Sequence, residues 1–250
     1  MDLLEIRKEI DEVNRQMSEL YDKREKLAQA VAECKKIDKT PILNEKREKE
    51  ILDKWSAGNP FKRKFFMNIM MLSRNLQTKL LLQKNIVLIG MSGCGKSTIG
   101  RIIAGALDLP LKDMDTEIEK QEKMSINQIF AEKGEGYFRN AETQQAIKLS
   151  KSKKPCVIPT GGGVVLNEEN MNLLKKTGIV FFIDRSPDSI IKNLNSEKRP
   201  LLKNDPQKLY EIYESRIDLY RKYADYTIEK NATPNTTAGE IINILQSMSL

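Results

Sequence analysis

Residues 85–101 constrain the fold of this chain more than any other stretch. An apolar run over 86–89 stops at Gly90, and the pattern G-x-x-x-x-G-K-S then runs to Ser97. Apolar residues recur at helical spacing immediately afterwards, at Ile99, Ile102, Ile103 and Leu107. A strand, a glycine-rich turn and a helix in this order are typical of a P-loop. The pattern therefore predicts an α/β domain in which a strand leads into a phosphate-binding turn.

The glycine-rich turn has a specific chemistry. Phosphate oxygens need several converging N–H donors, which only an unobstructed backbone can supply, and the helix N-terminus adds partial positive charge. Lys96 would reach the β- and γ-phosphates, and the Ser97 hydroxyl would ligate Mg²⁺. The nucleotide-binding residues are expected to be Gly93, Cys94, Gly95, Lys96, Ser97 and Thr98. The alternative is a glycine turn that only joins a strand to a helix.

Composition and charge exclude several classes of protein. Of the 250 residues, 40% are hydrophobic and 31% charged, and no apolar run approaches the ~20 residues that span a bilayer. The opening Met-Asp-Leu-Leu-Glu is no secretory signal, and three widely spaced cysteines favour a reducing compartment, so we expect a cytoplasmic protein. The absence of histidine excludes histidine bases and metal ligands. The net charge of +7 comes from interspersed residues, which suits small anionic substrates better than nucleic acid or a membrane.

The residues before the P-loop predict long helices. No glycine precedes Gly58 and no proline precedes Pro41. Apolar residues alternate at three- and four-residue spacing, as in a coiled coil, at Leu3, Ile6, Ile10, Val13, Met17, Leu20, Leu27 and Val31. A helix over residues 3–37 would be ~50 Å long. Such a helix needs a partner along its length, and we expect a second copy of the chain in a homodimer.

Polar residues interrupt the apolar face of each predicted helix. Arg24 fills a heptad position that should be apolar, and Ser73 and Gln77 do the same in the third helix. The face from Asn44 to Trp55 is polar at one end and apolar at the other. A polar cavity for an anionic ligand explains all these interruptions. The alternatives are an Arg–Glu pair that fixes the register of a coiled coil, or a plain dimerisation bundle.

Residues 3–80 resemble a chorismate mutase of the all-helical class, whose long first helices intertwine in a homodimer. The matching motifs are L-x-x-I/L-R at 3–7, R-[RE]-x-L-A at 24–28, P-x-x-[DN]-x-x-R-E at 41–48 and S-x-x-x-Q at 73–77. The resemblance implies that Arg24, together with Arg7 of the other protomer, binds the two carboxylates of chorismate. Lys35 and Gln77 would hydrogen-bond the ether oxygen, which makes them catalytic with Arg24. The remaining substrate contacts would be Asn44, Arg47, Glu48 and Ser73.

The chemistry of this family suits a chain without histidine. Rearrangement of chorismate to prephenate transfers no proton. It requires the dianion to be held in a compact conformer and the charge growing on the ether oxygen to be stabilised, for which cations and hydrogen-bond donors suffice. Glu48 would contact the substrate hydroxyl. Asn44 stands where the family often has aspartate, so we expect altered affinity and not loss of activity.

Strand and helix patterns alternate after the P-loop and predict a five-stranded parallel sheet covered on both faces. The expected strands are 86–89, 109–114, 156–159, 179–183 and 226–229, and the expected helices are 117–133, 165–176, 187–195, 206–223 and 237–247. Ligands bind at the carboxyl ends of the strands in such sheets. The P-loop and the segments 113–115 and 160–163 all fall at those ends.

Several polar residues near these strand ends have a chemical interpretation. Asp113 is suited to hold Mg²⁺ through water and Asp115 to take an acceptor hydroxyl, although Asp115 would also suit a helix N-cap. Arg139 follows a glycine-containing turn and is a candidate for binding a substrate carboxylate. Arg199 lies in a polar stretch with the composition of a mobile lid, from which it could contact a transferring phosphoryl group. Arg216 is a further candidate on a later helix; solvation is the alternative for each arginine.

The order of these motifs resembles shikimate kinase over about residues 84–250. The motifs are the P-loop, D-x-D at 113–115, G-x-x-x-F-R-x-x-E at 134–142, T-G-G-G at 160–163, K/R-R-P-L-L at 198–202 and R-x-x-x-Y at 216–220. The resemblance implies ATP and Mg²⁺ as cofactors, with Lys96 and Arg199 at the phosphates and Lys192 near adenine, where arginine is more usual. It places shikimate at Asp115, Arg139, Gly161, Gly162, Gly163 and Arg216. Pro159 before the glycine run is unusual in the family.

The sequence therefore predicts a bifunctional enzyme of aromatic amino-acid biosynthesis. A chorismate-mutase-like helical domain would occupy residues 1–84 and a shikimate-kinase-like P-loop domain residues 85–250. One alternative keeps the kinase and gives the first domain only dimerisation or allosteric ligand binding. Another is a P-loop NTPase with a coiled-coil arm on nucleic acid. The presence of Arg24, Lys35 and Gln77 together favours the bifunctional enzyme.

Overall fold

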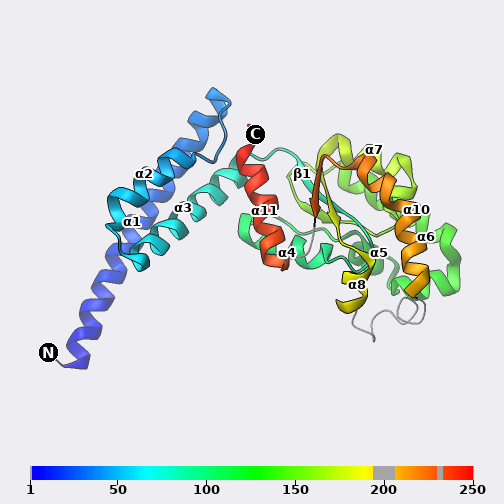
Figure 1. Ribbon diagram of the computed structural model, residues 1–250, viewed down its shortest axis with the longest axis horizontal. Helices are drawn as coiled ribbons and strands as arrows, with labels where there is room; N and C mark the ends of the chain where they lie inside the picture. The colour runs from blue at the N-terminus through cyan, green and yellow to red at the C-terminus, as the bar shows by residue number, and fades with distance from the viewer. Residues whose placement is uncertain (1, 194–205, 230–232, 250) are drawn as a thin grey trace. The chain divides into compact units, whose positions relative to one another are not determined.

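The computed structural model describes residues 2–193, 206–229 and 233–249, which fold into two compact units (Figure 1). The first unit comprises Met1–Leu81 together with Ile244–Leu250, and the second comprises Leu82–Asn243. The first is helical and the second is an α/β unit with a parallel sheet, so both predicted fold classes are confirmed. The domain boundary between residues 84 and 85 stays a prediction.

The helical unit is built from α1 (Leu3–Asp38), α2 (Glu45–Ser56) and α3 (Pro60–Leu81). Capping side chains fix where the first two helices begin. Asp2 accepts hydrogen bonds from the backbone N–H groups of Leu4 and Glu5, and Asn44 accepts one from Arg47. α1 and α2 each pack against α3. The long first helix expected from the heptad pattern is thus confirmed.

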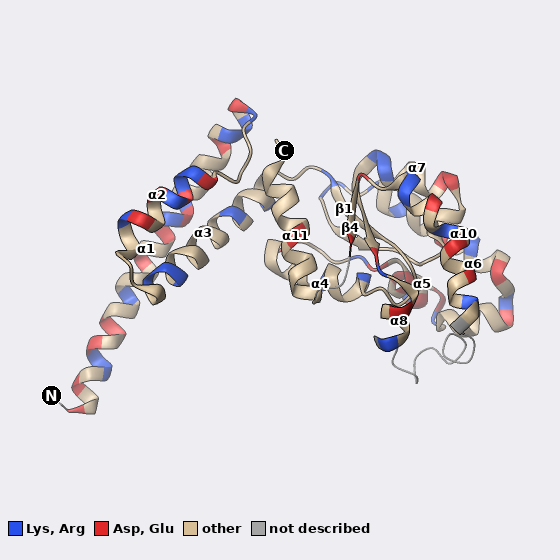
Figure 2. Cartoon of the chain, viewed as in Figure 1, with Lys and Arg blue, Asp and Glu red and all other residues tan. Residues whose placement is uncertain are grey.

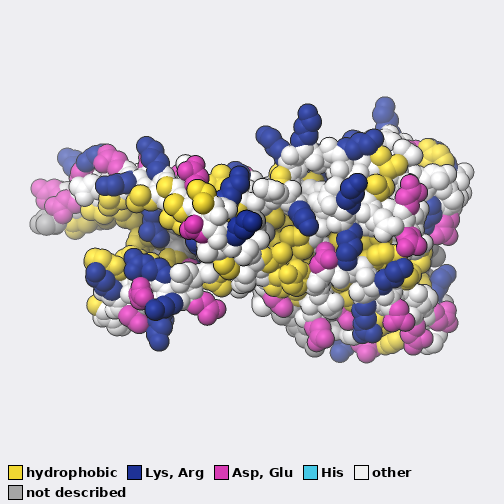
Figure 3. Space-filling view, turned by 90° about the horizontal axis from the view of Figure 1, so that it is seen from above, with side chains coloured by type: hydrophobic (Ala, Val, Ile, Leu, Met, Phe, Trp, Pro, Cys, Tyr) yellow, Lys and Arg dark blue, Asp and Glu magenta, His cyan; other side chains and the backbone are white. Residues whose placement is uncertain are grey.

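Most of the apolar stripe of α1 is exposed in a single chain. Only Ala28 and Ala32 are buried in this helix, whereas Leu3 is 64% and Leu20 66% exposed within the described part of the chain. The N-terminal end of α1 projects beyond α2 and α3 (Figure 1). Hydrophobic side chains are visible along the helical unit in the space-filling view (Figure 3). An uncovered apolar stripe of this length marks an interaction surface.

The α/β unit is organised on a parallel sheet with the strand order β2-β1-β3-β4. Its strands are β1 (Asn85–Ile89), β2 (Val157–Pro159), β3 (Gly178–Asp184) and β4 (Tyr226–Glu229). The central strands β1 and β3 are almost completely buried, as expected where helices cover both faces. The helices described after β1 are α4 (Lys96–Leu107), α5 (Met114–Glu122), α6 (Ile126–Ser150), η1 (Val164–Leu166), α7 (Glu168–Thr177), α8 (Pro187–Asn193), α10 (Pro206–Tyr223) and α11 (Pro234–Ser247), of which α4, α7 and α10 pack against strands.

The prediction of five strands is wrong: the described residues form a four-stranded sheet. The expected strand 109–114 makes only one isolated bridge, from Leu111 to Val157. Two backbone hydrogen bonds flank that bridge, from Lys112 N–H to the Val157 carbonyl (2.8 Å) and from Val157 N–H to the Pro110 carbonyl (2.9 Å). Pro110 has no N–H to extend the ladder, and α5 begins already at Met114, so the pairing stops there.

The single helix expected over 117–133 is also wrong. The chain leaves α5 at Lys123, which adopts a left-handed conformation (φ 55°), and α6 begins at Ile126 after a Ser125 cap. α6 continues to Ser150 across a non-helical residue, Gly134. Arg139 therefore lies on a helix, beyond a kink, and not directly after a turn.

Charged side chains of both signs are interspersed over each unit, as Figure 2 shows. This distribution agrees with the one expected from the sequence. Within the part of the chain that the structure describes, no helix combines the length and the hydropathy of a membrane span.

Candidate active sites

The loop between β1 and α4 has the backbone conformation of a phosphate-binding turn. Gly90 and Gly95 take positive φ values of 142° and 103°, which side chains other than glycine's rarely allow. Gly95 forms the N-cap of α4 without any side-chain hydrogen bond to the first N–H groups. These N–H groups and the positive end of the helix dipole are therefore available to an anion.

Lys96 occupies the centre of this loop. Its side chain is largely buried, and its ammonium group donates hydrogen bonds of 2.8 Å to the carbonyls of Gly90 and Met91. Ser97 and Thr98 follow on the exposed first turn of α4. The loop thus combines a fixed cation, open backbone donors and hydroxyl groups, a donor set that fits a nucleotide phosphate and its Mg²⁺. The described residues contain no cluster of acidic and cysteine side chains that would hold a metal by itself.

The glycine run at the end of β2 lies against both the P-loop and the predicted acceptor residues. A Cβ at Gly161 would be 2.8 Å from Asp115 Oδ1 and 2.9 Å from Glu142 Oε1. A Cβ at Gly162 would be 2.8 Å from the backbone N of Ser92. The structure therefore brings the predicted residues of 161–163 together with Asp115 beside the phosphate-binding turn.

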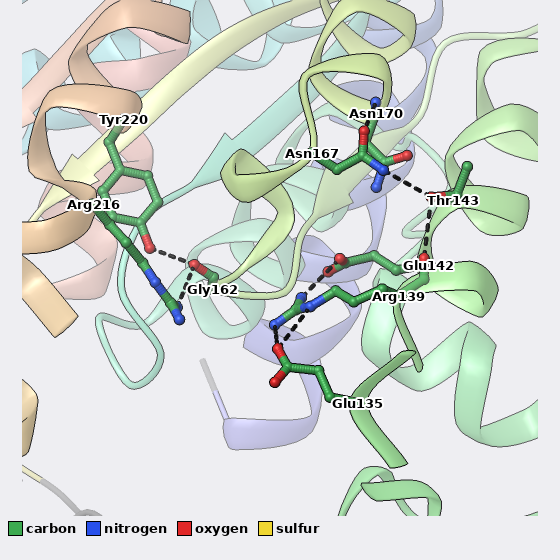
Figure 4. A network of polar contacts seen from close by, with 9 residues as sticks. All are labelled: Glu135, Arg139, Glu142, Thr143, Gly162, Asn167, Asn170, Arg216 and Tyr220. Atoms are coloured by element: carbon green, nitrogen blue, oxygen red, sulfur yellow. Dashed lines mark hydrogen bonds and ion pairs between the residues drawn. The ribbon is translucent and has the colours of Figure 1, made fainter. Parts of the chain in front are cut away.

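Two arginines approach this glycine run from different helices (Figure 4). Arg216 on α10 donates a 3.2 Å hydrogen bond to the Gly162 carbonyl, which also accepts one from the Tyr220 hydroxyl. Arg139 on α6 lies so close to Gly163 that a Cβ there would meet its guanidinium at 2.5 Å. The two predicted carboxylate-binding arginines thus converge on the same backbone segment.

Glu142 anchors the Arg139 guanidinium. The two side chains form a 2.9 Å ion pair, and Glu135 adds a second, 3.0 Å pair from the exposed side. Burial raises the pKa of Glu142 above its ordinary value, Arg139 opposes that rise, and nearby Asp115 adds to it. Its Oε1 has no hydrogen-bond partner in the described part of the chain. Glu135 and Tyr220 were not predicted as site residues, although they lie four residues from Arg139 and Arg216, on the same helix faces.

Three further kinase residues were predicted, namely Asp113, Lys192 and Arg199. Asp113 caps α5 by accepting a 3.4 Å hydrogen bond from Thr116 N–H, so the N-cap interpretation belongs to Asp113 and not to Asp115. Lys192 is exposed near the end of α8. Arg199 lies outside the described residues.

Alanine at Gly162 should impair the kinase site without unfolding the unit. The added methyl would collide with the Ser92 backbone at 2.8 Å and push the glycine run away from the P-loop. We expect phosphoryl transfer to fall by about 10- to 100-fold, because small displacements of reacting groups have effects of that size. Gly105→Ala is the matched control, since nothing lies within 4 Å of a Cβ there. Equal kinase activities of the two variants would contradict this account of Gly162.

The helical unit brings Lys35 and Glu48 together with Arg74, which the sequence did not single out. Glu48 forms an ion pair with Arg74, and both side chains are mostly buried. Burial lowers the pKa of Lys35, nearby Glu48 opposes that shift, and Arg74 adds to it. The Lys35 ammonium donates to the carbonyl of Ile42. Two cations and one carboxylate therefore share a partly desolvated region, where electrostatic interactions are stronger than in water.

Ser73 and Gln77 lie on the following helix, α3. The Ser73 hydroxyl donates a 3.0 Å hydrogen bond to the Ile69 carbonyl, so its proton is already bonded within α3. Gln77 is 6% exposed, and its Oε1 lacks a hydrogen-bond partner within the described residues. An unpaired buried oxygen costs about 1–3 kcal/mol, so this amide is placed to gain from a polar ligand.

The single chain leaves the remaining predicted mutase residues apart. Arg7 and Arg24 are exposed on α1. Arg47 pairs with Glu50 on the surface at 3.1 Å. Asn44 caps α2, a structural role that its short amide performs as well as aspartate would.

Comparisons with known proteins identify both units. The family model for shikimate kinase matches residues 92–246, and the one for chorismate mutase type II matches residues 6–78. A shikimate kinase from Clostridium botulinum is 42% identical over 164 residues, which cover 66% of this chain and 98% of that protein. Another, from Thermodesulfovibrio yellowstonii, is 42% identical over 170 residues, covering 66% of this chain and 97% of that protein.

Solved structures agree with the sequence comparisons. The shikimate kinase from Acinetobacter baumannii, determined in complex with shikimate, superposes with a TM-score of 0.63 at 35% identity and covers 67% of this chain and 96% of its own. The shikimate kinase from Aquifex aeolicus superposes with a TM-score of 0.58 at 37% identity and covers 65% of this chain and 96% of its own. The chain therefore belongs to the shikimate kinase family and carries a chorismate mutase type II domain ahead of its kinase domain.

Proposed function

We propose that the α/β unit transfers the γ-phosphoryl group of ATP to the 3-hydroxyl of shikimate. The observation that supports this most is the convergence of Asp115, Arg139 and Arg216 on the glycine run, next to the P-loop. Arg139 and Arg216 would bind the substrate carboxylate, and Asp115 would hold the acceptor hydroxyl towards the phosphates. Lys96 would leave its loop carbonyls for the β- and γ-phosphates. Mg²⁺, held by Ser97 and through water by Asp113, would neutralise phosphate charge.

We propose that the helical unit rearranges chorismate to prephenate. Arg24 and the partner's Arg7 would bind the substrate carboxylates in the compact conformer. Lys35 and Gln77 would stabilise the charge that develops on the ether oxygen. Glu48 would contact the substrate hydroxyl, while its ion pair with Arg74 would hold its carboxylate away from that oxygen. The purified chain should therefore consume both chorismate and shikimate with ATP. Shikimate-dependent ATP turnover without chorismate turnover would instead support the alternative in which the helices only dimerise or bind a regulatory ligand.

We propose a cytoplasmic homodimer in which the exposed stripes of two α1 helices pack together. The three cysteines are free thiols, which suits a reducing compartment. The stripe residues from Leu3 to Leu20 are exposed in one chain, and Arg7 stands beside them. A second copy would cover the stripe and bring Arg7 to the other protomer's Arg24, Lys35 and Gln77.

Charges placed in the α1 stripe should abolish dimerisation and strongly reduce the mutase activity. The double variant Ile10→Lys/Val13→Lys puts two ammonium groups where the helices would meet. We expect a monomer by sedimentation velocity and a loss of about 100-fold in mutase kcat/KM, because one substrate carboxylate loses its arginine. Kinase activity should remain. Ser18→Lys, at an exposed position of α1 outside the stripe, is the control. A monomeric variant with full mutase activity would contradict the shared site.

A further inference from the structure

The end of α11 contributes a buried glutamine to the helical unit. Gln246 is 1% exposed and makes hydrogen bonds to three residues of the helical unit, one before α2 and two on α3. Its carbonyl accepts from Leu43 N–H (2.8 Å), its side-chain Oε1 accepts from Arg74 Nε (2.8 Å), and its Nε2 donates to Asn75 Oδ1 (3.0 Å). A buried amide with both ends bonded holds its neighbours in one arrangement.

Arg74 connects Gln246 to Glu48. The guanidinium uses Nε for Gln246 and Nη1 for the Glu48 carboxylate. Because the guanidinium is planar and rigid, an acceptor fixed at Nε also fixes the direction in which Nη1 points. The side chains of Arg74 and Glu48 are only 17% and 24% exposed, so little solvent competes for these bonds.

The backbone hydrogen bond between Leu43 and Gln246 also constrains Glu48, through the start of α2. Leu43 precedes Asn44, which caps α2, and Glu48 lies one turn into that helix. The hydrogen bond from Leu43 to Gln246 therefore anchors the segment that sets the start of α2. Gln246 constrains Glu48 both through its helix and through its ion-pair partner.

We infer that Gln246 is a positioning residue of the mutase site, so that the end of α11 is a functional part of the mutase unit. By holding Arg74 in place, Gln246 keeps Glu48 paired with Arg74. Without it, Glu48 is free to pair with the Lys35 ammonium, whose charge is needed at the substrate ether oxygen. This inference rests on the proposed mutase function of the helical unit. A buried glutamine with a purely structural role is the competing explanation.

Two substitutions in the full-length chain separate these explanations. Gln246→Leu keeps the approximate size of the side chain and removes its two side-chain hydrogen bonds, to Arg74 and Asn75. Gln246→Glu keeps an acceptor for Arg74 Nε, and the Asn75 amide can turn to donate to it. We expect mutase kcat to fall by about 10- to 100-fold in the leucine variant and by less than about threefold in the glutamate variant. Kinase activity should be unchanged in both. Gln144→Leu, an exposed glutamine on α6, is the matched control.

The possible outcomes distinguish a failure of the proposed mutase function from a failure of the positioning role of Gln246. An unmodified chain that does not consume chorismate refutes the proposed mutase function, whatever Gln246 does. A chorismate-consuming chain whose leucine variant is equally fast refutes the positioning role. Equal losses in the leucine and glutamate variants, or a loss of helical circular dichroism in the leucine variant, show a structural role and also refute it. Loss in the leucine variant alone, with helicity and kinase activity retained, supports the inference.

Discussion

Replacing Lys96 with alanine should lower shikimate-dependent ATP turnover by at least ~1,000-fold. The Lys96 ammonium is the cation fixed at the centre of the P-loop, where it is held by the carbonyls of Gly90 and Met91 at 2.8 Å. Charge stabilisation of this kind, in a water-poor site, commonly accounts for about 10²–10³ in rate, and more in phosphoryl transfer. The backbone donors that remain can still bind phosphate, so KM for ATP should rise less than kcat falls. Release of ADP, followed in a coupled assay, measures the effect.

Lys148 provides a control for the Lys96 substitution. It is an exposed lysine on α6, and Lys148→Ala removes the same charge away from the phosphates. Its kinase activity should match that of the unmodified chain. A Lys96→Ala chain that kept more than a tenth of its activity would show that the loop does not work as a catalytic P-loop.

Replacing Lys35 with alanine should lower the rate of chorismate consumption by about 100- to 1,000-fold. Lys35 would donate to the ether oxygen, where negative charge grows in the transition state, and no proton transfer can substitute for that interaction. The Lys35 side chain is half-buried, and this burial lowers the pKa of its ammonium group, although nearby Glu48 opposes the shift. An ammonium in such surroundings stabilises developing charge more strongly than one in water. The decrease should be mainly in kcat.

The adjacent residue gives a matched control for Lys35. Lys36→Ala removes an exposed charge one position along α1 and should leave mutase activity within about twofold of the unmodified chain. Equal activities of Lys35→Ala and Lys36→Ala would remove Lys35 from the mechanism.

Local sequence patterns predicted most of the fold. The P-loop, the heptads of α1 and the strand at Tyr226–Glu229 depend on residues close together in the sequence, and each was predicted correctly. The misplaced strand at 109–114 had the right composition, but Pro110 and the early start of α5 limit it to one bridge. The helix expected over 117–133 failed because a left-handed lysine, Lys123, carries no sequence signal as clear as glycine.

The interactions that assemble the sites were harder to predict because they join distant segments. The sequence indicated Arg139 and Arg216 individually, yet their meeting at Gly162 and Gly163 depends on how α6 and α10 pack. Arg74 and Gln246 show no recognisable motif, and 172 residues separate them in the chain. Such pairs follow from tertiary packing and not from local pattern.

A crossed assay of Lys35→Ala and Lys96→Ala shows whether one chain carries two independent active sites. Chorismate consumption and shikimate-dependent ADP release are measured on each purified variant and on the unmodified chain. We expect Lys35→Ala to lose only the first activity and Lys96→Ala to lose only the second. Loss of both activities in Lys96→Ala, or full mutase activity in Lys35→Ala, would contradict this expectation.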